Sequence, residues 1–92
     1  MNNTSPTYPK ISLITPSLNQ GQFIEGTIQS VLSQNYPNLE YLVMDGGSSD
    51  NTIEVLKRYS SRLQWVSEKD QGQTDAINKG LRIASGDIVA YL

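Results

Sequence analysis

The chain has 92 residues, of which 37% are hydrophobic, and its seven basic and nine acidic residues give a net charge of −2. This length allows one small domain or a part of a larger one. The chain contains no cysteine and no histidine, which excludes disulfides, zinc-finger sites, cysteine nucleophiles and histidine-based triads.

The charge and hydropathy of the sequence argue against some classes of binding partner and indicate a cellular location. No block of Lys and Arg occurs, which argues against nucleic acid and against an anionic membrane surface as partner. No apolar run approaches the roughly 20 residues of a membrane-spanning helix, and the N-terminus lacks the pattern of a signal peptide. We therefore expect a cytoplasmic protein, or one at the cytoplasmic face of the membrane.

The predicted strands start after a polar, proline-containing segment. Residues 1–9 are predicted to form a flexible tail, which leaves 10–92 as the folded part. Short apolar runs predict strands over residues 11–15, 39–44, 63–67 and 88–92. The first strand is expected to stop at Thr15-Pro16, because proline removes a backbone donor. The second is almost continuously apolar, which predicts burial on both faces.

Three helices are predicted between these strands from apolar residues at helical spacing. The first follows a turn at 19–22 and has an apolar face of Ile24, Ile28, Val31 and Leu32. The second runs through Ile53, Leu56 and Tyr59. The third starts near Thr74, with Ile77, Leu81 and Ala84 facing inward and Gly86 as the residue after its end.

The alternating order of four strands and three helices predicts an α/β fold. Connections this short favour right-handed crossovers, which give a parallel sheet with helices on both faces. If the fourth strand returns beside the first, the strand order is 3-2-1-4 and the switch point lies between the first and fourth strands. Open α/β sheets bind ligands at such a point. We expect a crevice lined by Thr15, Pro16, Ser17 and whatever follows Leu92.

Two polar segments follow the first two strands at the expected ligand edge. In the first, residues 15–19, a proline turns the chain away and leaves backbone groups free, although an ordinary strand-ending turn has the same pattern. In the second, residues 45–50, Asp45 can accept a hydrogen bond from a base N–H, and the glycines allow close approach. A turn with a helix N-cap explains Asp50 or Asn51 but explains Asp45 poorly.

A third polar segment, residues 68–80, follows the third strand. Asp70 lies in its loop, and Asp75 lies near a helix N-terminus, where the helix dipole alone favours a carboxylate. An acid/base pair of Asp70 and Asp75 is conceivable, but the sequence does not give the separation that such chemistry requires. The dinucleotide fingerprint and the phosphate loop are both absent from the chain.

Four segments in order resemble the inverting family 2 glycosyltransferases, which have a GT-A fold. They are PKISLITPSLN at 9–19, QSVLSQNYPNLE at 29–40, VMDGGSSDNT at 43–52 and DAINKG at 75–80, and DIVAYL at 87–92 is similar to the fourth strand of the family. The resemblance implies a Rossmann-like half of the GT-A fold, truncated after the fourth strand. It also implies a nucleotide-sugar donor, often a UDP-sugar.

The resemblance assigns binding roles to particular residues. Thr15 and Pro16 would lie against the base and ribose, Asp45 would hold the base, and Asp70 and Asp75 would approach the ribose or diphosphate. The full set of candidate nucleotide-sugar-binding residues is Thr15, Pro16, Ser17, Asn19, Asp45, Gly47, Ser48, Asp70 and Asp75. No residue is assigned as catalytic or as a metal ligand.

The chain departs from the family after its fourth strand. The Asp-x-Asp metal motif would come directly after Leu92, where nothing follows. A divalent cation, Mn or Mg, and a saccharide or lipid-linked acceptor are therefore implied for the complete enzyme, whereas residues 10–92 are expected to be its nucleotide-sugar-binding half, inactive alone.

Two other functions compete with a glycosyltransferase fragment. The first is a non-catalytic nucleotide-binding or scaffold module, which would have the same crevice. A receiver-like signalling domain is disfavoured, because the first strand ends in Thr15-Pro16-Ser17 instead of an acidic cluster. If the fourth strand is the last of the sheet, its open edge at 88–92 predicts a homo-oligomer.

Overall fold

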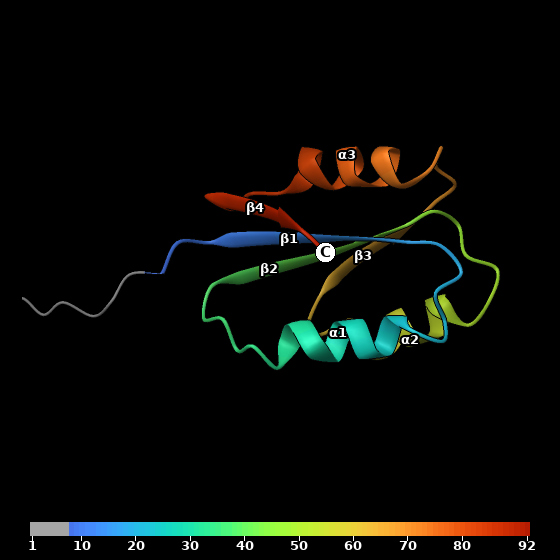
Figure 1. Cartoon of the computed structure of the whole chain (residues 1–92), viewed down its shortest axis with the longest axis horizontal. Helices are drawn as coiled ribbons and strands as arrows, with labels where there is room; N and C mark the ends of the chain where they lie inside the picture. The colour runs from blue at the N-terminus through green and yellow to red at the C-terminus, as the bar shows by residue number, and fades with distance from the viewer. Residues whose placement is uncertain (1–7) are drawn as a thin grey trace, which may run out of the picture.

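A computed structural model describes residues 8–92, so most of the predicted tail at 1–9 lies outside the described residues. The elements in chain order are β1 (Ile11–Ser17), α1 (Ile24–Leu32), β2 (Leu39–Asp45), α2 (Thr52–Arg58), β3 (Gln64–Ser67), α3 (Gln73–Ile83) and β4 (Ile88–Tyr91). All strand pairs are parallel and their order is β3-β2-β1-β4. Helices α1 and α2 cover one face and α3 covers the other (Figure 1). The predicted α/β fold and strand order are confirmed.

Strand β2 is the centre of the hydrophobic core and contributes to both faces of the sheet. Tyr41 and Val43 pack with α1 and α2, whereas Leu42 and Met44 pack on the α3 side. All four side chains are buried, as the continuous apolar run predicts. The hydrophobic cluster under α1 and α2 is larger than the cluster under α3.

Among residues 8–92, no helix is long and apolar enough to cross a membrane.

Strand β1 is longer than predicted, because Pro16 does not end it. β1 continues to Ser17, whose carbonyl accepts a hydrogen bond from Gly46 of the β2 side at 2.8 Å. On the opposite edge, the Leu92 N–H donates to the Ile14 carbonyl at 3.0 Å. The next bond of that ladder would come from an N–H at position 16, which proline lacks. Pro16 therefore offers no N–H to the Leu92 carbonyl on the β4 side and leaves the pairing with β2 intact.

Two expectations for α3 were wrong. Leu81 is 40% exposed, and the buried residues of the helix are Ala76 and Gly80, because the small side chains let the helix approach the sheet. Gly86 is not the left-handed residue after the helix, since the C-cap is Ala84 in an extended conformation. A Cβ at position 86 would lie 2.7 Å from the Ser12 nitrogen, so glycine is needed there for close packing against β1.

Candidate functional site

A cavity of about 340 Å³ opens at the carboxyl edge of the sheet. It lies between the end of β1, the loop before α3 and Leu92, which is the predicted switch point between β1 and β4. Its lining residues are Pro16, Ser17, Leu18, Gln20, Asp70, Gly72, Gln73, Ala76 and Leu92. The lining combines apolar surface with a few polar side chains, as small-molecule sites commonly do.

Asp45 is a buried hydrogen-bond hub beside this cavity. Its Oδ1 accepts hydrogen bonds from the Ser17 hydroxyl at 2.9 Å and from the Ser48 hydroxyl at 2.5 Å. Its Oδ2 accepts from the Ser67 hydroxyl at 2.8 Å and from the backbone N–H groups of Ser48 and Gly47 at 2.8 and 3.1 Å. Only 2% of Asp45 is exposed. The carboxylate thus joins the ends of β1, β2 and β3 to the loop that follows β2.

The hydrogen bonds also determine the ionisation of Asp45. Burial alone raises the pKa of this carboxyl, because it disfavours the charged form. The donors from Ser48, Ser67 and Ser17 outweigh that effect, so the pKa of Asp45 lies below its ordinary value. The carboxylate is therefore charged at neutral pH, and it is stabilised by the chain itself.

Asn19 ties the loop after β1 to the loop after β2. Its side-chain oxygen accepts hydrogen bonds from the N–H groups of Ser49 and Asp50, at 2.8 and 3.3 Å, and its own N–H donates to the Ser48 hydroxyl at 2.8 Å. Asn19 has a φ of 51°, in the left-handed region that asparagine tolerates. The Asp50 carboxylate adds a hydrogen bond from the Gly21 N–H at 2.9 Å. These contacts fix one rim of the cavity.

Asp70 and Asp75 have different positions. Asp70 is half-buried in the cavity wall, and its Oδ1 accepts a hydrogen bond from the Gly72 N–H at 2.9 Å. Asp75 caps the Gln71 N–H at 3.0 Å and lies 3.8 Å from the Lys79 ammonium, away from the cavity lining. No contact between the two carboxylates supports an acid/base pair.

The structure divides the nine predicted site residues into three groups. Pro16, Ser17 and Asp70 line the cavity. Asn19, Asp45, Gly47 and Ser48 belong to the hydrogen-bonded loops beside it. Thr15 is buried with its hydroxyl 3.0 Å from the Tyr41 hydroxyl, and Asp75 lies at the start of α3.

Some cavity residues were missed by the sequence analysis. Leu18 and Gln20 in the loop after β1, and Gln73 at the start of α3, line the cavity, but exposed residues of these types carry no pattern of their own. The available signal was their position, since each lies between the carboxyl end of a strand and the first turn of the next helix.

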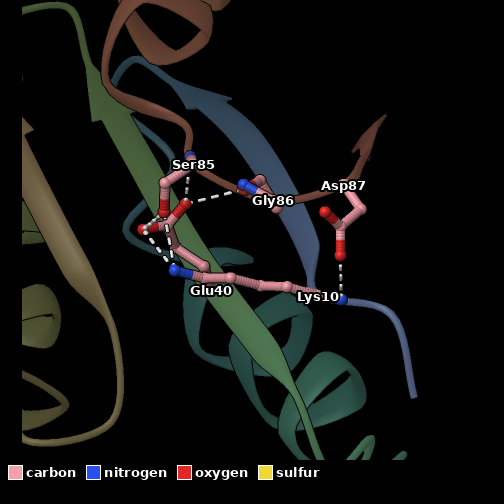
Figure 2. Close-up of polar contacts among 6 residues, drawn as sticks. Lys10, Glu40, Ser85, Gly86 and Asp87 are labelled. Atoms are coloured by element: carbon pink, nitrogen blue, oxygen red, sulfur yellow. Dashed lines mark hydrogen bonds and ion pairs between the residues drawn. The ribbon is translucent and has the colours of Figure 1, made fainter. Parts of the chain in front are cut away.

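A second polar cluster lies at the opposite, amino end of the strands and was also missed (Figure 2). Glu40 accepts hydrogen bonds from the Ser12 hydroxyl at 2.6 Å and from the Ser85 N–H at 2.9 Å, and its carboxylate lies 3.7 Å from the Lys10 ammonium. The Gly86 N–H donates to the Ser12 hydroxyl at 2.8 Å. The signal in the sequence was a charged residue inside an apolar strand.

The described residues do not fit a metal ion. No group of three or more Asp or Glu carboxylates in residues 8–92 lies close enough together to hold one. Asp70 and Asp75 each accept a hydrogen bond from a backbone N–H of the loop before α3, from Gly72 and Gln71 respectively.

Comparison with known proteins places this geometry in a family. The model of "Glycosyl transferase family 2" matches residues 12–92. The Bacillus subtilis protein named putative teichuronic acid biosynthesis glycosyltransferase TuaG is 40% identical over 88 residues, which are 91% of this chain and 35% of that protein. The Escherichia coli UDP-Glc:alpha-D-GlcNAc-diphosphoundecaprenol beta-1,3-glucosyltransferase WfgD is 43% identical over 84 residues, which are 89% of this chain and 33% of that protein.

Solved structures show the same architecture. A mannosyltransferase of Pyrobaculum calidifontis, in complex with GDP-Man and Mn²⁺, superposes with a TM-score of 0.82 at 32% identity, over 90% of this chain and 26% of that one. Glucosyl-3-phosphoglycerate synthase of Mycobacterium tuberculosis, with Mn²⁺ and UDP, gives a TM-score of 0.75 at 28% identity, over 91% and 33%. The chain thus spans about a third of the length of the B. subtilis and E. coli relatives.

Proposed function

The chain belongs to glycosyl transferase family 2, and from that premise we propose that it forms the nucleotide-binding part of a glycosyltransferase that takes its sugar from a UDP-sugar. The observation that carries the proposal is the cavity at the switch point between β1 and β4. Open α/β sheets bind nucleotides at this position. The similarity to enzymes in complex with GDP-Man or UDP supports the same class of ligand.

The cavity offers an apolar wall and an acceptor to a nucleotide. The base packs against Pro16 and Leu18, and Asp70 accepts a hydrogen bond from an N–H of the base or from a ribose hydroxyl. Asp70 is suited to this role because Oδ1 already holds the Gly72 N–H, which leaves Oδ2 for a ligand.

For Asp45, Asn19, Gly47 and Ser48 we propose an indirect role, in which they hold the loops that shape the rim. Direct contact of Asp45 with the base, as the resemblance implies, stays a prediction. Its carboxylate already accepts five hydrogen bonds within the protein. A hydrogen bond to a ligand would have to be added to these or replace one of them.

Sugar transfer itself needs more than these residues. The related enzymes with Mn²⁺ support a divalent cation in the reaction, and such an ion offsets charge on the leaving diphosphate. We propose that the 92-residue chain binds nucleotide without Mn²⁺ and does not transfer sugar alone. For the whole protein we propose a saccharide or lipid-linked acceptor at the cytoplasmic face of the membrane, in keeping with the diphosphoundecaprenol in the name of the E. coli relative.

Calorimetric titration of the chain with UDP tests this proposal, with GDP as the comparison. We expect UDP to bind with and without Mn²⁺, and Asp70→Asn to weaken binding about tenfold, the effect of losing one good hydrogen bond. Glu54→Gln is the matched control, because it makes the same chemical change at an exposed position of α2. Absence of binding at millimolar UDP and GDP contradicts the proposal.

We also propose that the chain pairs with a second copy through β4, which is an edge strand of the sheet formed by residues 8–92. The N–H of Ile88 donates to Lys10 just before β1, and that of Leu92 donates to Ile14 of β1. The N–H groups of Val89 and Tyr91 therefore point to the open side. All four side chains are exposed. No charged residue or proline within 88–92 blocks an added strand.

An antiparallel pair of β4 strands is self-complementary when Val89 lies opposite Tyr91 of the second copy. Ile88 then lies opposite Leu92, so the cross-strand pairs are apolar. The two Asp87 residues lie at opposite ends of the ladder, roughly 20 Å apart at about 3.3 Å per residue, beyond the screening length of about 8 Å. Such a short ladder buries less than the roughly 800 Å² per partner of a standard interface, so the dimer is weak.

Sedimentation velocity over a range of concentrations tests the dimer. We expect the apparent mass to rise with concentration, and Val89→Lys to remove that rise by placing a charge in the ladder. A monomer at every concentration, or a dimer that survives Val89→Lys, contradicts this pairing.

A further inference from the structure

Gly46 lies directly against the carboxylate of Asp70, although the two residues are far apart in the chain. A Cβ atom at position 46 would lie 2.8 Å from both carboxylate oxygens of Asp70 and 3.0 Å from its Cγ. Real Cβ atoms do not come this close to other heavy atoms, so any side chain at position 46 would displace the carboxylate. The Gly46 backbone itself is fixed, because its N–H donates to the Ser17 carbonyl at 2.8 Å.

The contact, and not the backbone conformation, is the reason for glycine at position 46. The glycines with a left-handed φ are Gly47 and Gly72, at 91° and 115°, and Gly46 is not one of them. Alanine therefore fits the backbone of position 46 without strain. What alanine meets there is the end of a flexible side chain, which can move aside at little cost to the fold.

We propose that Gly46 is a positioning residue for nucleotide binding: by having no side chain, it lets the Asp70 carboxylate stay in the cavity wall. This inference rests on the proposed function of the cavity. Two contacts then determine where Asp70 points, namely the hydrogen bond from the Gly72 N–H and the surface of Gly46. Loss of the second moves the acceptor out of reach of the ligand, while the fold remains.

A double-mutant cycle with UDP as the probe separates this role from a general structural one. We expect Gly46→Ala and Asp70→Ala each to weaken UDP binding about tenfold, as the loss of one hydrogen bond does. Asp70→Ala removes the three atoms nearest to a Cβ at position 46. Gly46→Ala should therefore cause no further loss of affinity in the Asp70→Ala background.

Two results of the double-mutant cycle would contradict the positioning role of Gly46. Equal losses from Gly46→Ala in both backgrounds, or no loss from Gly46→Ala while Asp70→Ala weakens binding, would overturn the inference. Gly26→Ala is the matched control, since a Cβ at that position in α1 meets nothing within 4 Å. We expect Gly26→Ala to leave the affinity unchanged, and Gly46→Ala to leave the thermal midpoint close to that of the parent chain.

An NMR measurement without nucleotide tests the position of the Asp70 carboxylate independently of nucleotide binding. In NMR spectra, the side-chain carboxyl resonance of Asp70 should move in Gly46→Ala and stay in place in Gly26→Ala. If neither UDP nor GDP binds the parent chain, the proposed function fails, and with it the role in binding. An unmoved Asp70 resonance in Gly46→Ala would instead overturn the positioning itself, even if UDP binds.

Discussion

Strand β2 carries one hydrogen-bonded carboxylate at each end, and the two have different surroundings. Asp45, at the carboxyl end, is held by donors from the strand ends and from the loop after β2. Glu40, at the amino end, is held by Ser12 of β1 and by Ser85 of the turn between α3 and β4 (Figure 2). One partner of Asp45, Ser17, also lines the cavity, whereas no partner of Glu40 does.

The comparison shows that hydrogen bonds around a carboxylate do not by themselves mark a binding site. Glu40 accepts several hydrogen bonds and lies near a lysine, and its bonds with Ser85 connect the segment before β4 to β2. Asp45 has more donors still, and they fasten the loops. What distinguishes the carboxyl end is the cavity beside the network, together with Asp70, a carboxylate that the network does not use.

The largest difference between the two ends is expected from removing each carboxylate. Asp45→Ala leaves the buried Ser17 hydroxyl without its acceptor, and it also strips the acceptor from Ser67, Ser48 and Gly47. We expect a loss of about 3 kcal/mol of unfolding free energy, since each unsatisfied buried donor costs roughly 1–3 kcal/mol. Urea denaturation measures this loss.

That loss is a large part of the roughly 5–10 kcal/mol expected for a domain of this size. Asp45→Asn keeps the shape of the side chain and serves as the milder variant if Asp45→Ala does not fold. An Asp45→Ala chain as stable as the parent would contradict the role of Asp45 as a hub.

The Glu40→Ala variant should have a smaller effect, because this end is nearer to solvent. The Glu40 side chain is 11% exposed, and its lysine partner is 37% exposed. We expect a loss of about 1–2 kcal/mol with unchanged UDP affinity, because none of its partners touches the cavity. Hydrogen exchange should show faster opening of β4 than in the parent chain. Weakened UDP binding in Glu40→Ala would remove the distinction between the two ends.

The smallest effect is the pH dependence of stability. The hydrogen bond from Ser12, with those from Ser85, holds the pKa of Glu40 below its ordinary value, and the pKa of Asp45 is also lowered. The unfolded chain therefore binds more protons than the folded one in acid. The stabilisation is present above the unfolded pKa values of about 4 and is lost as the pH falls through the lower folded values.

Urea denaturation between pH 7 and pH 2 measures this profile. We expect Asp45→Asn and Glu40→Gln each to flatten the fall of unfolding free energy below about pH 4, since each removes one of the titrating groups. An unchanged slope in both variants would show that other carboxylates dominate the acid response.

Much of the fold could be predicted because it depends on local patterns and on handedness. Short connections between apolar runs leave few topologies, and the order β3-β2-β1-β4 is among the simplest of them. The details that failed depend on contacts between distant segments. Gly86 is needed because of Ser12 on another strand, and Leu81 is exposed because Ala76 and Gly80 take the contact with the sheet.

The site could be predicted as an edge of the sheet, but not as a set of contacts. The position after a strand identifies Pro16, Ser17 and Asp70 as edge residues, and all three line the cavity. The position along the sequence cannot tell which carboxylate already accepts its hydrogen bonds from other groups of the protein. Asp45 is engaged because three serines from separate segments converge on it, and that convergence exists only in the folded chain.

Pro16 also has a consequence for the hydrogen bonds between β1 and β4. In a parallel ladder every second residue offers an N–H to the neighbouring strand, and position 16 is where β1 has none for the carbonyl of Leu92. The Leu92 carbonyl therefore receives no hydrogen bond from β1, although the Leu92 N–H still donates to Ile14. One missing proton thus weakens the contact between β1 and β4 at the point where Pro16 and Leu92 both line the cavity.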